Sequence, residues 1–394
     1  MSDQFENAVE LNSIVHAIRK CRVGVSYKGG VNDAWIHALV FGKRLRDDIL
    51  RDRYRMRKGT LVKIYRPKPR VANAPFFRDR VWQRSMCDNG LYDDLTAGLI
   101  EENFACQKGK GTDKAIRHIV RCLQELWRED PNSPIYGDHL DIRKFFPSTP
   151  HIEIHELERR RVMEPRFLQY LHEIVESQED PRPQDEIYRD PFGARGTGLG
   201  SQINQLVQIA LLDDLDHDIK KICRHYARYN DDFLVLSHNR DEVESVNKLI
   251  RSRLADKGLT MTDKCGIFTV DHGFYFMRKR FILTSTGKIV IRLHKDAMAD
   301  ERHILRCLKY GVDHGERSME DVKRHYQSWI SMAEYCGDAP IMAMDKFYTE
   351  LFRSKPIYKR KKRYLYGKPQ NYPKSFAKNL GARKGKCAAQ RCVE

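Results

Sequence analysis

The sequence lacks the features of a secreted, membrane-spanning or zinc-finger protein. Its N-terminal residues, MSDQFENAVELNS, contain acids and no apolar core, so they do not resemble a secretory signal. No window approaches the roughly 20 apolar residues that a membrane span needs. The ten cysteines include no CxxC pair, which disfavours a zinc ribbon or zinc finger, and no internal repeat is visible. These absences predict a cytoplasmic protein with reduced, mostly buried cysteines and no membrane partner.

The length and charge of the chain narrow the class of partner. With 394 residues, of which 41% are hydrophobic, the chain can bury a core and form two or three domains or one fold with several lobes. The formal net charge of +17 favours a polyanionic partner, most simply nucleic acid, because phosphate neutralisation releases counterions. Charge alone does not name an activity.

Two adjacent acids, Asp231 and Asp232, mark the central feature of the sequence. They lie between Tyr226–Tyr229 and the apolar, β-prone run Phe233–Leu236, which predicts a hairpin with carboxylates at its tip. Neighbouring aspartates in a tight turn can both reach a hard divalent cation, whereas regular strand alternation would separate them. Because Asn-Asp-Asp is also ordinary turn chemistry, the pair alone leaves a solvated turn open.

A third acid, Asp141, follows an apolar strand predicted from Ile135 to Leu140. Phe145 and Phe146 come next and could be ordinary core residues. A carboxylate at a strand end and, about ninety residues later, a pair at a hairpin tip form the set that two-metal phosphoryl transfer requires. In that chemistry one ion lowers the pKa of an attacking 3′-hydroxyl, and the other stabilises the leaving pyrophosphate.

Three loops have the composition of ligand-binding segments. Prolines in Arg66–Arg70 hold cations extended. Lys108 and Lys110 lie in a glycine-containing loop ahead of a helix predicted over 113–127, which suits a phosphate contact, although a solvated turn is the alternative. Closely spaced glycines in Gly196–Gln205 precede a helix predicted to about Cys223 and let the backbone approach a ligand.

The remaining pattern predicts a mostly helical chain with two β-rich stretches. Residues 1–60 read as helices, 61–65 as a strand, 76–82 as the start of a helix, 167–176 and 241–257 as helices, 179–191 as a loop, 273–291 as strands and 295–352 as helices. Residues 353–394 contain 14 Lys plus Arg against one acid and are predicted to be disordered until bound.

Segments of this sequence resemble six motifs of one enzyme family. DIRKFFPS resembles the A motif of bacterial reverse transcriptases, RYNDDFLVL resembles their YxDD motif, and GTGLGSQINQ is similar to their Gly-rich B motif. RPKPR with FFRDRVWQ and NFACQKGKGTDKA resembles the fingers of reverse transcriptases from diversity-generating retroelements, retrons and related defence-associated groups. MTDK and HGFYFMRKRFILTSTGKIV resemble their D and E motifs. The resemblance covers residues 60 to 295 and continues into a thumb-like helical segment.

The resemblance implies an α+β fold of the right-hand polymerase type, with fingers, an antiparallel-sheet palm and a helical thumb. It implies an N-terminal helical segment at 1–60, fingers at 61–135, a palm at 136–294, a helical thumb at 295–352 and a basic tail at 353–394.

The resemblance also implies roles for single residues. It assigns Asp141, Asp231 and Asp232 as metal carboxylates, with the Ile142 carbonyl completing a site for two Mg²⁺ ions, or Mn²⁺, and Lys264 as the general acid for pyrophosphate. The residues it implies for nucleotide binding are Lys68, Arg70, Phe146, Leu199, Gly200 and Gln205, with Phe146 as the aromatic gate against the sugar 2′ position. Expected contacts to nucleic acid are Arg78, Arg80, Lys108, Lys110, Lys359, Arg360, Lys361, Lys362 and Arg363.

Some positions depart from the family pattern. Asn230 occupies a variable slot where many relatives carry Met, Ala or Val, Thr197 and Gly198 replace a more usual apolar-Pro pair, and Asn204 stands where Ser is common. These departures bear on fidelity and template handling and leave the metal carboxylates intact.

The implied function is an RNA-directed DNA polymerase that uses deoxynucleoside triphosphates, an RNA template or associated non-coding RNA, and a DNA product. No endonuclease or RNase H segment is visible, and the GLGSQ form of the B motif favours a defence-associated protein that works with its own structured RNA against phage. A diversity-generating retroelement enzyme is the alternative, and a homo-oligomer or accessory protein is a possible partner. A catalytically silent nucleic-acid scaffold is the competing class, disfavoured because an acidic cluster without metals would repel phosphates.

Overall fold

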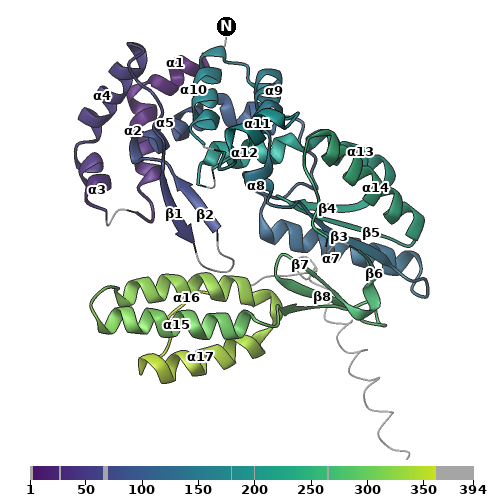
Figure 1. Cartoon of the computed structure of the whole chain (residues 1–394). Coiled ribbons are helices and arrows are strands. Elements are labelled where there is room, and N and C mark those ends of the chain that lie inside the picture. The colour runs from purple at the N-terminus through teal and green to yellow at the C-terminus, as the bar shows by residue number, and fades with distance from the viewer. Residues whose placement is uncertain are drawn as a thin grey trace, which may run out of the picture. The chain divides into compact units, whose positions relative to one another are not determined.

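A computed structural model describes residues 3–25, 28–64, 70–178, 180–198, 200–263 and 266–360 (Figure 1). The chain divides into two compact units, residues 1–289 and 290–394. Both helices and antiparallel sheets are present, which agrees with the mixed character expected from the sequence. None of the described helices is long and apolar enough to cross a membrane.

The first unit begins with four helices: α1 (Gln4–Val9), α2 (Leu11–Cys21), α3 (Gly29–Ile36) and α4 (Ala38–Leu50). Helix α2 buries Ile14, Ala17, Ile18 and Cys21, a spacing that places them on one face. That face packs against α5 (Phe77–Met86), where Trp82 is fully buried. The predicted helical character of residues 1–60 is confirmed as far as Leu50.

A hairpin and a run of helices follow. Strands β1 (Thr60–Ile64) and β2 (Arg70–Ala74) pair antiparallel, so the backbone of Arg70 already belongs to a strand. Helix α5 is followed by a kinked segment, η1 (Cys87–Leu91), in which Asn89 and Gly90 have non-helical backbone angles, and then by α6 (Tyr92–Thr96). Helix α7 (Thr112–Glu129) follows the loop that contains Lys108 and Lys110, as predicted.

The central sheet of the first unit has the strand order β4-β5-β3-β6. Its members are β3 (Tyr136–Asp141), β4 (His225–Tyr229), β5 (Asp232–Ser237) and β6 (Ile267–Thr269), and all neighbours are antiparallel. Helix α14 (Arg240–Asp256) packs on the face that carries Asp138, whose Oδ2 accepts a hydrogen bond of 2.6 Å from Asn247. Side chains alternate along a strand, so His139 and Asp141 lie on the opposite face.

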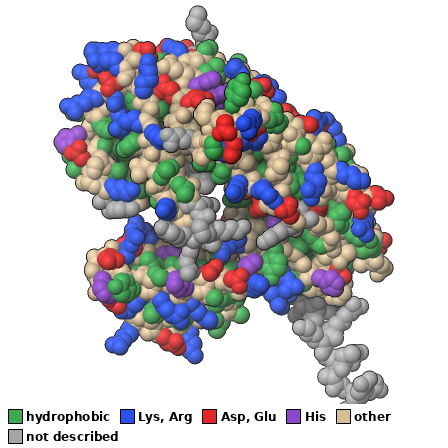
Figure 2. Space-filling view, in the orientation of Figure 1, with side chains coloured by type: hydrophobic (Ala, Val, Ile, Leu, Met, Phe, Trp, Pro, Cys, Tyr) green, Lys and Arg blue, Asp and Glu red, His purple; other side chains and the backbone are tan. Residues whose placement is uncertain are grey.

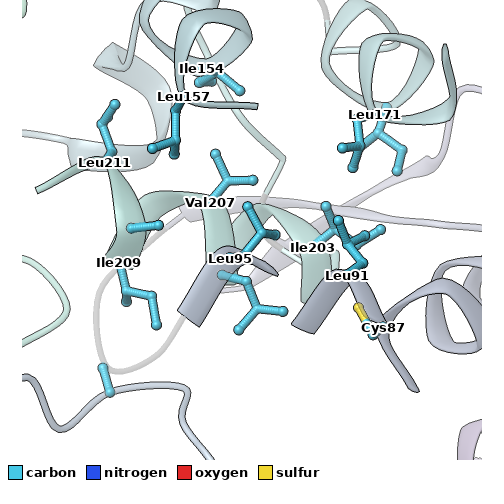
Figure 3. Packing of buried hydrophobic residues seen from close by; sticks show 14 of the residues in the cluster. Cys87, Leu91, Leu95, Ile154, Leu157, Leu171, Ile203, Val207, Ile209 and Leu211 are labelled. Atoms are coloured by element: carbon cyan, nitrogen blue, oxygen red, sulfur yellow. The ribbon is translucent and has the colours of Figure 1, made fainter. Parts of the chain in front are cut away.

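Between β3 and β4 the described residues form six helices, which are α8 (Phe145–Ser148), α9 (His151–Arg161), α10 (Pro165–Glu176), α11 (Gln184–Arg189), α12 (Gln202–Leu211) and α13 (Asp213–Ile222). Helix α12 is buried on most sides, since eight of its ten residues are buried, including the polar Asn204 and Gln208. In Figure 3, Ile203 and Val207 of α12 lie beside Leu91 and Leu95, in agreement with the packing of α12 on α6.

Two sequence expectations for this region were wrong. The stretch 179–191, expected to be a loop, contains α11. The single helix expected to reach Cys223 is instead two helices that are separated at Leu212. Asp213, Asp214 and Asp216 lie in the first turn of α13, where acidic side chains favour a new helix N-terminus, so the chain restarts there.

The first unit ends with β7 (Phe274–Phe276) and β8 (Lys279–Leu283), which pair antiparallel, and the boundary to the second unit falls within β9 (Ile289–Leu293). The second unit contains α15 (Ala297–Asp313), α16 (Met319–Ala333) and α17 (Asp338–Phe352). They enclose a core that includes Leu305, Val322, Tyr326, Ile330, Met344 and Tyr348. The helices expected over 295–352 are therefore present.

The described start of the basic tail is attached to the second unit. Tyr358 donates a hydrogen bond of 2.7 Å to Asp345, and the Lys359 amide donates one of 2.7 Å to Gln327. Arg360 pairs with Asp338. The disorder expected for residues 353–394 was therefore wrong for residues 353–360, which make these contacts, and residues 361–394 lie outside the described residues.

Candidate metal and nucleotide site

Asp141 and Asp232 face each other at one end of the central sheet. They are direct partners in the antiparallel register of β3 and β5. Residues in such positions have Cβ atoms about 4.5–5.5 Å apart and point to the same face. Like charges directly opposite are destabilising, so this position favours a cation between them. Both side chains are only partly buried, and that of Asp232 is 31% exposed.

Asp231 occupies the two-residue turn that joins β4 to β5. Tyr229 and Asp232 form the closing pair of the hairpin, and Asn230 takes a φ of 61°. Asn accepts this left-handed conformation more readily than most residues, which accounts for its presence in the variable slot of the motif. The Ile142 amide donates a hydrogen bond of 3.4 Å to the Asp231 carbonyl. The structure therefore brings Asp141, Ile142, Asp231 and Asp232 together.

A fully buried charged network supports this turn from within the protein. Arg228 and Asp216 form an ion pair in which both side chains are 0% exposed. The Arg228 guanidinium also donates to the carbonyls of Asn230, at 3.0 Å, and Ile209, at 2.8 Å. Tyr226 donates a hydrogen bond of 2.6 Å to Asp216, and burial together with that carboxylate raises the pKa of Tyr226. The network fixes the backbone next to Asp231.

His139 is a further residue of the site. Its Nε2 lies 3.1 Å from Asp232 Oδ1, and its ring packs edge-on against Phe276 with centroids 5.3 Å apart. Sequence reasoning missed both His139 and the Arg228 network. The sequence did contain a signal for both residues. Each is a polar or charged residue inside an otherwise apolar strand, and such a side chain needs a partner when it is buried.

The segment resembling the D motif lies beside Asp141. The Thr262 amide donates to the Asp141 carbonyl at 2.8 Å, and the Arg143 amide donates to the Thr260 carbonyl at the same distance. Arg143 also forms an ion pair with Asp263. Lys264, the predicted general acid, lies outside the described residues.

Phe145 and Phe146 have different surroundings although they are adjacent. Phe145 belongs to the main core cluster of the first unit, whereas Phe146, 8% exposed, is not part of that cluster. The Phe146 carbonyl accepts hydrogen bonds from Thr197, at 2.8 Å from its amide and 3.2 Å from its hydroxyl. Fully buried Gln208 donates to Thr197 and to Thr149. These bonds connect the A-like and B-like motifs.

The glycine-rich segment packs tightly against β2. Gly200 has a φ of 127°, and a Cβ there would come within 2.5 Å of the Asn73 carbonyl. Only glycine allows this approach. Gln205, farther along α12, accepts a bond of 3.7 Å from the thiol of Cys106 in the basic loop. Leu199 lies outside the described residues.

The cationic residues that were predicted to contact nucleic acid have different surroundings in the structure. Arg80 and Gly200 line one cavity of about 170 Å³ with Lys20 and Arg84. Arg78 instead pairs with Asp48.

The two lysines of the basic loop contact other parts of the protein. Lys108 lies over the Tyr92 ring, 4.0 Å from its centroid. The Lys110 side chain is 9% exposed and donates to the carbonyls of Ile100 and Glu101, and burial lowers its pKa. The Lys110 ammonium therefore faces the protein interior.

Five of the cationic side chains that were predicted to contact nucleotide or nucleic acid lie outside the described part of the structure. Lys68, Lys361, Lys362 and Arg363 lie outside the described residues, as does the side chain of Arg70. On the face shown in Figure 2, Lys and Arg side chains are spread among acidic and apolar ones.

The donor atoms at the end of the central sheet fit a hard divalent cation. Asp141, Asp231 and Asp232 offer carboxylate oxygens and Ile142 offers a backbone carbonyl, the ligand types that Mg²⁺ prefers. The direct opposition of Asp141 and Asp232 supplies a reason for a cation at this position, because it would relieve their repulsion.

The chain has structural similarity to telomerases at low sequence identity. It aligns with apo telomerase from Candida tropicalis truncated from its C-terminal domain with a TM-score of 0.41 and 12% identity, over 59% of this chain and 57% of that one. Telomerase from Candida albicans in complex with the TWJ fragment of telomeric RNA gives 0.47 and 10%, over 89% and 62%. Apo telomerase from Candida tropicalis gives 0.46 and 11%, over 75% and 60%.

This chain therefore spans about three fifths of the length of these telomerase chains. No protein-family model and no curated protein matches it. Because the three TM-scores are below 0.5, the functional argument rests on the site itself.

Proposed function

We propose that this protein is a reverse transcriptase, an RNA-directed DNA polymerase that adds deoxynucleotides by two-metal phosphoryl transfer. The observation that carries the proposal is the direct pairing of Asp141 with Asp232 at the sheet end, with Asp231 in the adjoining turn. Asp141 lies about ninety residues before the adjacent Asp231 and Asp232. It belongs to the segment that resembles the A motif, they belong to the segment that resembles the YxDD motif, and the two segments meet at one end of the sheet.

Under this proposal the central sheet is the palm, the β1–β2 hairpin with its neighbouring helices is the fingers, and α15, α16 and α17 form the thumb. The packing of Gly200 against Asn73 supports the assignment, because it connects the glycine-rich segment to strand β2 of that hairpin. The cavity that Arg80 shares with Lys20 and Arg84 offers cations for a phosphate, although Lys20 and Arg84 both pair with Asp88.

Under this proposal, the residues of the site have different roles in catalysis. Asp141, Asp231 and Asp232 would hold two Mg²⁺ ions, with Mn²⁺ as a substitute, and the pair of ions supplies activation of the 3′-hydroxyl and charge stabilisation of pyrophosphate. His139 orients the Asp232 carboxylate through its hydrogen bond. Phe146, held through its carbonyl by Thr197, would pack against the sugar of the incoming nucleotide.

We further propose that the enzyme works with a structured non-coding RNA in antiviral defence. The support is the resemblance of the GLGSQ segment and the fingers segment to defence-associated reverse transcriptases, together with the net charge of +17. Sequencing the nucleic acids that co-purify with the protein tests this role. One defined RNA and its DNA copy are expected. DNA copies of a repeat from a neighbouring gene would point to a diversity-generating retroelement instead.

Primer extension tests the activity. The purified full chain, with Mg²⁺, an RNA template and deoxynucleoside triphosphates, is expected to extend a primer, and Asp141→Asn is expected to abolish extension. Asp271→Asn, which changes a carboxylate that is 65% exposed, is the matched control and should extend normally. Normal extension by folded Asp141→Asn would overturn the metal assignment. A wild-type protein that binds RNA but never extends a primer would be the silent scaffold.

A further inference from the structure

Helices α9 and α10 carry a polar cluster that the proposed polymerase chemistry does not use. The two helices pack against each other, and each contributes one imidazole and one carboxylate. His155 and Glu158 are three residues apart on α9, and His172 and Glu176 are four apart on α10. These spacings place each pair on one face of its helix. The four side chains therefore meet between the helices.

The distances within the cluster are short. His155 Nδ1 lies 3.2 Å from Glu158 Oε2, and His155 Nε2 lies 3.2 Å from Glu176 Oε1. One donor atom each from His155, Glu158 and His172 lie within 4.8 Å of one another. The rings of His155 and His172 are stacked, with centroids 3.8 Å apart and planes 4° apart.

Two buried polar atoms at this cluster lack a hydrogen-bond partner among the described residues. Glu158 is 1% exposed, and its Oε1 is one of them. His151, one turn before His155 and 6% exposed, has its Nδ1 unpartnered, 3.7 Å from Glu176 Oε1. Leaving such atoms unsatisfied costs free energy, so each calls for an explanation.

A proton on His155 explains only part of the arrangement. Burial lowers the pKa of His155, but hydrogen bonds to Glu158 and Glu176 raise it more, so the net shift is upward. An imidazolium between two carboxylates would satisfy Glu158 Oε2 and Glu176 Oε1. It would leave Glu158 Oε1 without a partner, whereas His151 Nδ1 already lies 3.7 Å from Glu176 Oε1. A cation in the cluster provides a partner for the Glu158 carboxylate as a whole.

We propose that α9 and α10 hold a structural Zn²⁺ ion through His155, Glu158 and His172, with Glu176 as the fourth ligand. Imidazole nitrogens with carboxylate oxygens suit Zn²⁺ and similar first-row divalent ions, whereas Mg²⁺ prefers oxygen ligands alone. Four protein ligands would close the site, as in structural Zn²⁺ sites, with Glu158 almost fully buried and the Glu176 side chain 63% exposed. Because the two rings are parallel, one of them turns toward the ion on binding.

The ion would also stabilise the backbone at Ala194 and Gly196, where the glycine-rich segment begins. His151, at the start of α9, lies with Nε2 2.9 Å from the Gly196 carbonyl, and its amide donates to the Ala194 carbonyl at 2.9 Å. Fixing α9 against α10 therefore also fixes these two backbone positions. This consequence concerns the proposed polymerase, whereas the Zn²⁺ site itself does not depend on that function.

Zinc binding by the full chain tests the proposal. The protein is stripped with a chelator, saturated with Mg²⁺ to occupy the carboxylates of the sheet, and titrated with Zn²⁺ by calorimetry. We expect one high-affinity equivalent and a rise in melting temperature of about 4 °C at a hundredfold excess of free Zn²⁺ over its Kd. We expect His172→Gln and Glu158→Gln each to weaken binding on the order of 100-fold or more, since even outer-shell changes cost 10- to 100-fold.

Two controls isolate the cluster. His16→Gln removes an exposed histidine on α2, and Asp231→Asn removes a carboxylate of the sheet; both should keep the Zn²⁺ equivalent. If Glu158→Gln fails to fold, His172→Gln decides, because His172 is only partly buried. Absence of a high-affinity equivalent, or its retention in folded His172→Gln, overturns the proposal. Because the readout is zinc binding, failure here is distinct from failure of primer extension.

Discussion

The end of the central sheet and the helix pair α9–α10 both gather acids from separate elements, yet they differ in donor chemistry and exposure. At the sheet end the proposed ligands are oxygens alone. The His139 imidazole lies 3.1 Å from Asp232 but is not one of those ligands, and the Asp232 side chain is 31% exposed. Between the helices, imidazoles accompany the acids, and Glu158 is 1% exposed. Under the two proposals, the ligands that accompany the carboxylates determine the cation, because oxygen ligands alone suit Mg²⁺ and imidazoles suit Zn²⁺.

The two clusters also differ in how they are held. The turn at Asp231 is fixed by backbone hydrogen bonds and by the Arg228–Asp216 pair, whose guanidinium bonds are shared among three acceptor residues. In the helix pair, buried Glu158 Oε1 has no partner among the described residues. The sheet site is therefore preorganised without an ion, whereas we expect the helix site to be completed by one.

The largest expected effect separates the two sites by function. Asp231→Asn keeps the size of the side chain in the turn but removes one charge from the proposed metal ligands. We expect primer extension to fall by several powers of ten, since the metals carry most of the transition-state charge stabilisation. Zinc binding and the melting temperature should stay near wild type. Extension within tenfold of wild type would remove Asp231 from the catalytic set.

The next effect tests the support beneath the sheet site. Arg228→Met leaves Asp216 buried without its partner and is expected to lower the free energy of unfolding by about 3–5 kcal/mol. Arg240→Met breaks an exposed ion pair with Glu244 and should cost less than about 1 kcal/mol. Urea unfolding of both variants gives the comparison. Equal losses would show that the buried network contributes no more than a surface pair.

The adjacent phenylalanines sharpen the contrast between packing and function. Phe145→Ala, in the core cluster, should cost about 3–5 kcal/mol of stability. Phe146→Ala should instead relax discrimination against ribonucleotides by roughly 5- to 150-fold, because a close-packed ring resists a 2′-hydroxyl by about 1–3 kcal/mol. Matched incorporation efficiencies and melting curves separate the two. An unchanged ratio with a lowered melting temperature would make Phe146 a core residue.

The smallest effect concerns the residue that orients a carboxylate. His139→Gln weakens or removes the 3.1 Å contact to Asp232, and we expect kcat to fall about tenfold, in line with roughly 1.5 kcal/mol for a hydrogen bond to a charged group. Stability should change little because the His139 side chain is 33% exposed. Steady-state rates at several Mg²⁺ concentrations measure the effect. An unaltered rate would leave His139 with no part in positioning the carboxylate.

Local sequence patterns predicted the elements of the sheet site well. The apolar run before Asp141 and the aromatic and apolar runs around Asp231 gave β3 and the β4–β5 hairpin almost to the residue. The register that places Asp141 opposite Asp232 could not be predicted from local sequence patterns. It depends on two strands about ninety residues apart, whose pairing is set by the tertiary fold.

Side-chain partners were the least predictable part. Arg228 was not singled out from the sequence, and it is fully buried because α13 supplies Asp216 as its ion-pair partner. Lys110 looked available for phosphate, but the carbonyls of Ile100 and Glu101 accept its hydrogen bonds. The α9–α10 cluster was not noticed, because its four members become neighbours only when two helices pack. In each case the partner comes from another segment of the chain.

The bridge between residues 141–143 and 260–262 consists of peptide groups. The Thr262 amide and the Asp141 carbonyl make one contact, and the Arg143 amide and the Thr260 carbonyl make the other. Peptide groups are the same in nearly every residue, so side chains in this segment can change over evolutionary time while the bridge persists. The geometry around Asp141 therefore does not depend on which side chains occupy residues 260–262, and homologues can keep it when these residues differ.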